Sequence, residues 1–408
     1  MPRAHALPGS SDRSAIQELL SRRSAALVDR DRDAFMSTLS EDSLLFRSRQ
    51  RDLFRWMGSV PLESYELVAV WNRVGDLVRP ADRLRYQDAE AVAIPVTEER
   101  YRISDYDSTE AIEDIYFTFV KQDGEWLIAD DSDLEELGVL SARHLWDFGP
   151  VYAERSEHFI LFGHPCGAPG APSDDCERVP SSFLDLAEEA LQRVRRYWTV
   201  EWPDRVVVLV PGTEAELTRM LQLTFDVENF VAFASSSVDS RRGIDYTGPR
   251  IVFNQESLTT RPSTSVRDVL AHELLHVATR YSSGPFVPVF VEEGLADYVG
   301  NDGGEEALSF LASEVSSGVF DRVLPLDFEF TTGTGTDIFR SYQESHSSVR
   351  FFVLRWGLQR FLRFYRELGS REVRTGTARY HVNDALEEVL GLGYARFQKL
   401  WADSLSPR

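Results

Sequence analysis

The segment HELLHVAT, residues 272–279, places two histidines and a glutamate within five positions. Four residues are about one helical turn, so His272 and His276 project from the same side of a helix. Two neutral imidazoles in that arrangement can take adjacent corners of a tetrahedral zinc ion. Glu273 lies about 100° further round the helix, where its carboxylate stands beside the metal as a general base for water.

A third metal ligand is expected in FVEEGLADYVG, residues 290–300, which supplies Glu293 after a gap of sixteen residues from His276. A carboxylate completes a three-ligand site and leaves one position open for water, as a catalytic zinc requires. Asp297, one turn further on, is expected to accept the second ring N–H of a ligand histidine and fix its tautomer. Glu292 is the competing ligand, but the residue one turn after it is Ala296, which offers no such carboxylate.

The segment RPSTSVRDVLAHELLHVATRY carries the two histidines, and Pro262 near its start separates the expected helix from what precedes it. Ser265 is the predicted N-cap, with Asp268 three residues on in an arrangement close to a capping box. Four residues give this helix its apolar face: Val266, Val269, Leu270 and Leu274.

HELLH and EEGLADY together resemble the gluzincin metallopeptidases, the thermolysin-like and aminopeptidase-like group, and especially the peptidase MA-like domains of bacteria. The resemblance covers roughly residues 155–405. It implies a hydrolase that cleaves peptide bonds with one zinc ion per chain, held by His272, His276 and Glu293. The general base implied is Glu273. Many relatives have asparagine where this chain has Glu292, so hydrogen bonding beside the ligand differs here.

The same resemblance implies an oxyanion donor and a binding edge. In the aminopeptidase branch a tyrosine opens the helix corresponding to YQESHSSVRFF, and by position this is Tyr342, unless that ring merely packs. Relatives bind substrate as an added strand along a sheet edge, here residues 229–237. His346 is either a second donor in the cleft or a partly exposed polar residue. The Gly/Thr-rich part of residues 301–337 is expected to form a mobile rim.

The N-terminal part reads as helices followed by strands, an α+β pattern. Helices are expected at residues 13–29 and 30–40, and strands within 64–74, 89–103 and 113–133. KQDGEW, residues 121–126, predicts a hairpin with Asp-Gly at its tip.

Residues 12–136 resemble the cone-shaped nuclear-transport-factor-2-like and SnoaL-like domains, and an accessory role is expected for them. Some members of that superfamily are isomerases or cyclases with a polar group deep in the cone, but no acid or histidine here can be placed in such a pocket from the sequence. Residues 1–11 are expected to be a disordered tail, and residues 137–156 are expected to be the linker to the second domain.

The second expected domain, residues 157–408, is predicted to be zincin-like, with a mixed sheet, active-site helices and a helical C-terminal subdomain. Strands are expected at 157–163, 205–212, 229–238 and 250–255, helices at 181–198 and 213–223, and a hairpin turn at 240–249.

Composition bounds the class of protein. A length of 408 residues predicts two domains, with three as the alternative, and 43% hydrophobic content is ordinary for a globular chain. A formal net charge of −22 argues against nucleic acid or an anionic membrane as partner. The peptide or protein substrate is implied by the resemblance to metallopeptidases. No run of about 18 apolar residues predicts a transmembrane segment. Oligomeric state is left open.

The compartment depends on the N-terminus and the cysteines. MPRAHALPGSSDRS lacks the apolar stretch of a secretory signal, so the sequence as written predicts a cytoplasmic protein. A secreted or cell-surface protein is the alternative if that end is trimmed or misassigned. Cys166 and Cys176 could close a small disulfide loop, remain free thiols, or bind a metal with His164; the disulfide is favoured.

Two other functions remain open at this stage. The chain could retain zinc without catalysis, as a sensor or adaptor, although an intact Glu273 speaks against a pure binding site. Alternatively the N-terminal domain could act as a small-molecule isomerase or cyclase.

Overall fold

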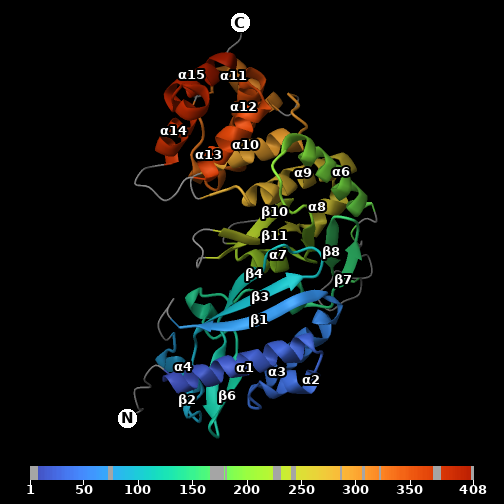
Figure 1. Cartoon of the computed structure of the whole chain (residues 1–408), viewed down its shortest axis with the longest axis vertical. Coiled ribbons are helices and arrows are strands. Elements are labelled where there is room, and N and C mark those ends of the chain that lie inside the picture. Colours follow the sequence, from blue (N-terminus) through green and yellow to red (C-terminus); the bar gives the residue numbers. More distant parts are fainter. Residues whose placement is uncertain are drawn as a thin grey trace.

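The chain folds into a mixture of helices and strands (Figure 1), which agrees with the α+β class expected from the sequence. This computed structural model describes residues 8–71, 77–165, 179, 182–223, 231–239, 245–284, 287–305, 308–320, 323–370 and 378–405. Within these ranges no helix combines the length and the apolar character needed to cross a bilayer. The expected Cys166–Cys176 pairing and residues 1–7 of the expected tail lie outside the described residues.

Helices open the N-terminal region: α1 (Ser10–Val28), α2 (Arg32–Ser37), α3 (Leu44–Trp56) and, later, α4 (Pro80–Arg85). The two helices expected at residues 13–29 and 30–40 are confirmed, and the apolar positions of α1, such as Ile16 and Leu20, are fully buried. α3 was not expected. Its first residues, Leu44 and Leu45, are exposed, so the regular apolar repeat on which helix prediction depends is interrupted there.

Two three-stranded antiparallel sheets follow. The first has the order β1 (Leu62–Val70), β3 (Val96–Ile103), β4 (Ala111–Ile115), and the second β2 (Ala91–Ala93), β5 (Thr118–Gln122), β6 (Glu125–Asp130). Pro95 separates β2 from β3, because a proline has no N–H to give to a ladder, and the two strands join different sheets. The predicted hairpin is confirmed: Asp123 and Gly124 link β5 to β6 with φ of 50° and 82°.

A five-stranded mixed sheet forms the middle of the molecule, in the order β10-β11-β9-β8-β7. Its strands are β7 (Tyr152–Arg155), β8 (Phe159–Gly163), β9 (Val206–Val210), β10 (Ala232–Asp239) and β11 (Asp245–Phe253). β8, β9 and β11 run parallel, and the outer strands pair antiparallel. Residues 245–249, expected in a turn, belong to β11, and the rest of that expected turn lies outside the described residues.

Both faces of this sheet are covered, which explains the unbroken apolar runs FILFG and VVVLV. Phe159 and Leu161 pack into the core built with the C-terminal helices. Ile160 and Phe162 face the opposite way and join the core of the N-terminal elements. The N-terminal core therefore continues into residues beyond 156, and the division of the chain into two domains stays a prediction.

Residues 137–156, expected as a linker, contribute to the N-terminal core and to the five-stranded sheet. Leu145 and Trp146, on the short helix α5 (Leu145–Phe148), are buried in the N-terminal core. β7 then supplies an outer strand of the five-stranded sheet. Apolar side chains spaced through this segment give it surface to bury, which a flexible linker lacks.

A buried polar cluster lies in the N-terminal part. From the sequence alone, no acid or histidine could be assigned to a pocket there. The carboxylate of Glu99 on β3 contacts the His144 ring at 2.5 Å and accepts from the Tyr65 hydroxyl at 2.7 Å. The alternation of side chains along a strand could have indicated that Glu99 is buried. Thr97, Glu99 and Tyr101 share one face of β3, and all three are buried. Burial alone lowers the pKa of His144, but Glu99 outweighs it and raises that pKa to about 9.

The contact between His144 and Glu99 predicts that the free energy of unfolding falls at alkaline pH. The pKa of His144 is about 9 when folded and about 6.5 when exposed, so its contribution is complete below about pH 6.5 and disappears as the pH rises through 9. Denaturant unfolding at about pH 6 and about pH 10 should show a larger loss of unfolding free energy in the natural chain than in His144→Gln. Equal losses in the two proteins would contradict the assignment.

Helices pack around the upper part of the five-stranded sheet and form the end of the molecule opposite α1 (Figure 1). They are α6 (Phe183–Tyr197), α8 (Gln255–Thr260), α9 (Ser263–Arg280), α10 (Val289–Gly300), α11 (Ser309–Ser317), α12 (Gly335–Trp356), α13 (Leu358–Gly369), α14 (Ala378–Leu390) and α15 (Tyr394–Leu405). The remaining helix, α7 (Glu214–Leu221), lies on the opposite face of the sheet, where Leu217 joins the core of the N-terminal elements. The expected helices at 181–198 and 213–223 correspond to α6 and α7.

Small residues let α10 sit between α9 and α12. A Cβ on Gly294 would come within 2.6 Å of the backbone oxygen of Ser345 on α12. A Cβ on Gly300 would come within 3.0 Å of the backbone oxygen of Asp268 on α9. The buried Arg193 of α6 donates to the Gly300 carbonyl and, at 2.8 Å, to the Asp268 carboxylate. These contacts fix α10 against α9.

Residues 301–337 connect α10 to α12, and only their Gly/Thr-rich end was expected to form a mobile rim. Before that end, Leu311 on α11 and the later residues Leu324 and Phe330 are buried in the protein core. The Gly/Thr-rich end is exposed and leads directly into α12, where Thr334 and Asp337 exchange hydrogen bonds as a capping box. Its mobility stays a prediction.

Candidate metal and catalytic site

α9 presents the HELLH motif from a helix whose start differs from the prediction. Pro262 is the N-cap residue, and the Pro262 carbonyl accepts the first helical hydrogen bond from Val266. Ser265 is therefore not the N-cap, and Asp268 instead pairs with Arg193. The prediction was wrong because proline can precede the first turn without needing a side-chain cap. The apolar face is as expected, with Leu270 and Leu274 fully buried.

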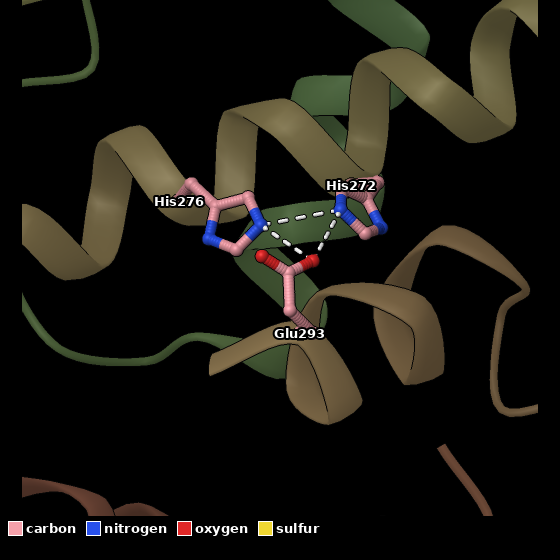
Figure 2. Close-up of side chains that lie close together, drawn as sticks. All are labelled: His272, His276 and Glu293. Atoms are coloured by element: carbon pink, nitrogen blue, oxygen red, sulfur yellow. Dashed lines mark hydrogen bonds and ion pairs between the residues drawn. The ribbon is translucent and has the colours of Figure 1, made fainter. Parts of the chain in front are cut away.

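Three side chains from two helices converge at one point (Figure 2). His272 and His276 project from α9, with their Nε2 atoms 3.2 Å apart. The Glu293 Oε2 atom on α10 lies 3.2 Å from Nε2 of His272 and 3.4 Å from Nε2 of His276. The three side chains are 15%, 9% and 18% exposed, so the cluster is mostly buried yet open to solvent on one side.

The neighbouring acid Glu292 takes no part in this cluster. Its carboxylate accepts from the Tyr365 hydroxyl at 3.4 Å and lies 3.9 Å from the guanidinium of Arg280. One residue along a helix turns a side chain by about 100°, which separates the two glutamates. The structure thus brings Glu293, and not Glu292, to the two histidines.

These distances fit a tetrahedral metal ion. Ligand bonds of about 2.0–2.1 Å to a central zinc give ligand–ligand edges of about 3.3–3.4 Å in a tetrahedron. Two imidazole nitrogens and one carboxylate oxygen are also a donor set that zinc commonly takes. The same three residues form the candidate metal-binding group among the described residues.

Asp297 supports one of the ligands. Its Oδ1 lies 2.9 Å from the Nδ1 atom of His272. A carboxylate accepts, so Nδ1 carries the proton and Nε2 of a neutral ring presents its lone pair to the cluster. Asp297 is one turn after Glu293, and α10 therefore holds a ligand and the partner of another ligand on one face.

Replacing Asp297 by asparagine should weaken zinc binding by about 10–100-fold, because the amide no longer holds the His272 ring as a carboxylate does. Competition with a chromogenic chelator measures this directly. Asp302→Asn is the matched control, since Asp302 binds Arg196 and Tyr197 at the surface. Unchanged affinity in Asp297→Asn would show that the contact does not orient a ligand.

The charges in the cluster are strongly coupled. Burial by itself raises the pKa of Glu293, but the two imidazoles outweigh it and lower that pKa well below its usual range. Burial lowers the pKa of His272, yet Asp297 and Glu293 raise it well above the usual value.

Glu273 lies beside the cluster without joining it. The side chain is buried, and its carboxylate accepts a hydrogen bond from the backbone N–H of Ala234 on β10. Burial raises the pKa of Glu273, and the two histidines oppose that rise. A carboxylate held in this way is a suitable general base near neutral pH. Sequence reasoning could not identify the Ala234 contact, because it joins backbone and side chain across two elements.

Tyr342 lies within electrostatic range of the same site. Burial raises the pKa of its phenol well above the usual value, and the charges of Glu293, Asp297 and Glu273 raise it further. The ring packs edge-on against Phe330 at 5.3 Å. Tyr342 does not open its helix as expected, since α12 begins at Gly335.

His346 is not the partly exposed residue that one reading of the sequence expected. It is fully buried, and its ring stands edge-on to Tyr298 with centroids 6.1 Å apart. Among the described residues neither ring nitrogen has a hydrogen-bond partner. The exposed reading was wrong because the packing of α10 on α12 covers this face of α12. The other reading, a second donor in the cleft, stays a prediction.

Comparison with known proteins adds no family to this description. No protein-family model matches the chain, and no curated protein matches it either. The resemblance to gluzincins therefore depends on the motifs HELLH and EEGLADY alone. Any proposal about function depends on the geometry of the site.

Proposed function

We propose that the protein is a zinc-dependent peptidase of the gluzincin type, with one zinc ion per chain. The observation that carries the proposal is the convergence of His272, His276 and Glu293 at tetrahedral spacing, with the Glu273 carboxylate beside them. In this proposal the N-terminal elements are an accessory domain of nuclear-transport-factor-2-like form, and the five-stranded sheet with its helices is the zincin-like domain.

The arrangement of donors supports an ion at the centre. With Nδ1 of His272 bound to Asp297, three lone pairs point at a common position, which is unfavourable unless a positive charge lies between them. Zinc bound there would lower the pKa of water and polarise a carbonyl group.

The remaining groups suit hydrolysis of an amide. Glu273 is placed to take a proton from the attacking water and to return it to the leaving amine. The Ala234 N–H orients its carboxylate. The Tyr342 phenol, kept protonated by its raised pKa, can donate to the oxygen that gains charge during the attack.

A peptide is the substrate that the neighbouring sheet edge suits. β10 pairs with β11 on one side, and within the described residues no strand pairs with its other side. An extended peptide can add to that side through main-chain hydrogen bonds. The expected binding edge at 229–237 corresponds to β10, except that residues 229–230 lie outside the described residues. Because Ala234 contacts Glu273, such a peptide would pass the base.

Metal analysis tests the proposal. The gently purified protein should hold about one zinc per chain. Adding zinc to chelator-treated protein should stabilise it by about 2.7 kcal/mol at a free concentration of 100 times Kd, and the melting temperature should rise. Magnesium, which prefers oxygen ligands in an octahedron, should not replace it. A protein that contains no zinc and gains no stability from zinc would refute the proposal.

Two alternatives from the sequence receive less support. A zinc-retaining sensor or adaptor has no need of a base, whereas Glu273 is buried and oriented at the cluster. An isomerase or cyclase in the N-terminal part would need a free acid or base. There, both oxygens of Glu99 are already engaged, by Tyr65 and His144.

A further inference from the structure

A cavity of about 390 Å³ lies between the N-terminal elements and the open edge strand of the five-stranded sheet. β4 supplies one wall, including Glu113, and β10 supplies another through Ser235, Ser236 and Ser237. The strands approach closely beside it: a Cβ on Gly248 of β11 would come within 2.6 Å of the Ala111 Cα atom of β4. The Ser237 hydroxyl donates to Glu113 at 2.9 Å across this junction.

The cavity adjoins the candidate catalytic site along β10. Ala234, which contacts Glu273, is followed directly by the three serines of the cavity wall. Side chains alternate along a strand, and Phe233 packs on the side of the N-terminal core while Ala232 packs toward the helices. Ser235 shares the side of Phe233, and Ser237, beyond an irregularity in the β10–β11 pairing, also reaches the cavity. A peptide added to the edge of β10 would therefore direct every second side chain toward this cavity.

Glu113 brings a negative charge to the cavity and has no cationic partner of its own among the described residues. Two cationic groups lie near Glu113, but each already has its own carboxylate. Arg250 binds both oxygens of Asp107, at 2.5 and 2.7 Å, and His144 contacts Glu99. Glu113 has a hydroxyl partner, Ser237, and among the described residues no cation forms an ion pair with it. Burial raises the pKa of the Glu113 carboxyl, so its ionised form is short of solvation that a cation would replace.

We propose that Glu113 and this cavity form a specificity subsite that receives a cationic group of an extended peptide, a lysine or arginine side chain two or three residues from the bond that is cleaved. The inference deepens the proposed peptidase function and rests on it. The spacing is set by β10, since Ala234 and Ser237 are three residues, or about 10 Å, apart along a strand. The formal net charge of −22 favours the approach of such a peptide.

Binding to a protein that cannot turn over its ligand provides the test. Zinc-loaded Glu273→Gln would be titrated with fluorescent, N-acetylated peptides in which one lysine moves through an otherwise neutral sequence, and norleucine replaces it in the controls. Lysine at one position should bind about tenfold more tightly than norleucine, as expected for a charge-assisted contact. Glu113→Gln in the same background should abolish that preference. Glu66→Gln, which changes an exposed glutamate on β1, at the other edge of the same sheet, should retain it.

The outcomes separate the inference from the function on which it rests. Equal binding of lysine and norleucine peptides, or a preference unchanged in Glu113→Gln, would overturn the subsite. If the natural chain cleaves peptides without such a preference, the subsite fails and the peptidase stands. If it neither holds zinc nor cleaves any peptide, the peptidase proposal itself fails.

Discussion

Replacing Glu273 with glutamine should leave zinc bound and lower peptide hydrolysis by about 10²–10⁴-fold, the usual contribution of a positioned base. Glutamine has nearly the shape of glutamate and can still accept the Ala234 N–H, but it cannot take a proton from water. The carboxylate is not one of the three converging ligands, so the metal content should not change. Initial rates on a quenched peptide library, together with metal analysis of the same sample, measure both quantities.

Measuring hydrolysis and zinc content on the same sample of Glu273→Gln separates the role of a base from the role of a ligand. A variant that loses both zinc and activity would place Glu273 among the ligands, in conflict with the observed cluster. A variant that keeps full activity would exclude Glu273 as the base. Loss of activity with retained zinc also argues against the sensor or adaptor alternative, because such a protein has no catalytic rate to lose.

Replacing Glu293 with glutamine should remove the third ligand and reduce zinc affinity by more than the 10–100-fold typical of losing a supporting partner. An amide oxygen is a weaker, neutral ligand, and the two imidazoles would lose the charge that the buried carboxylate supplies. Activity at limiting zinc should fall with the affinity. Chelator competition gives the affinity, and activity measured against free zinc gives the functional consequence.

The adjacent glutamate offers a matched control on the same helix. Glu292→Gln makes the same chemical change one residue away, where the side chain contacts Tyr365 and Arg280 instead of the histidines. Zinc affinity should remain within a few fold of the natural value in Glu292→Gln. If Glu292→Gln loses zinc and Glu293→Gln retains it, the ligand assignment is reversed.

Local sequence determined the parts of this protein that depend on residues close in the chain. Helical spacing placed His272 and His276 together on α9, and Asp-Gly between two apolar runs specified the β5–β6 hairpin. The mixed α+β class followed from the same periodicities. Predictions were wrong where the local sequence pattern was ambiguous. The start of α9 was misplaced and α3 was not expected. The segment 137–156 was expected as a linker, but part of it is buried in the folded core.

Tertiary structure alone decided which distant groups meet. The approach of Glu293 to the histidines requires α10 to lie against both α9 and α12, which the glycines at 294 and 300 permit. The Ala234–Glu273 contact and the junction of Glu113 with Ser237 each join segments far apart in the chain. Periodicity fixes the direction in which a side chain leaves its own helix or strand. The element it then faces is selected by burial of apolar surface across the whole molecule, a sum that no short stretch of sequence contains.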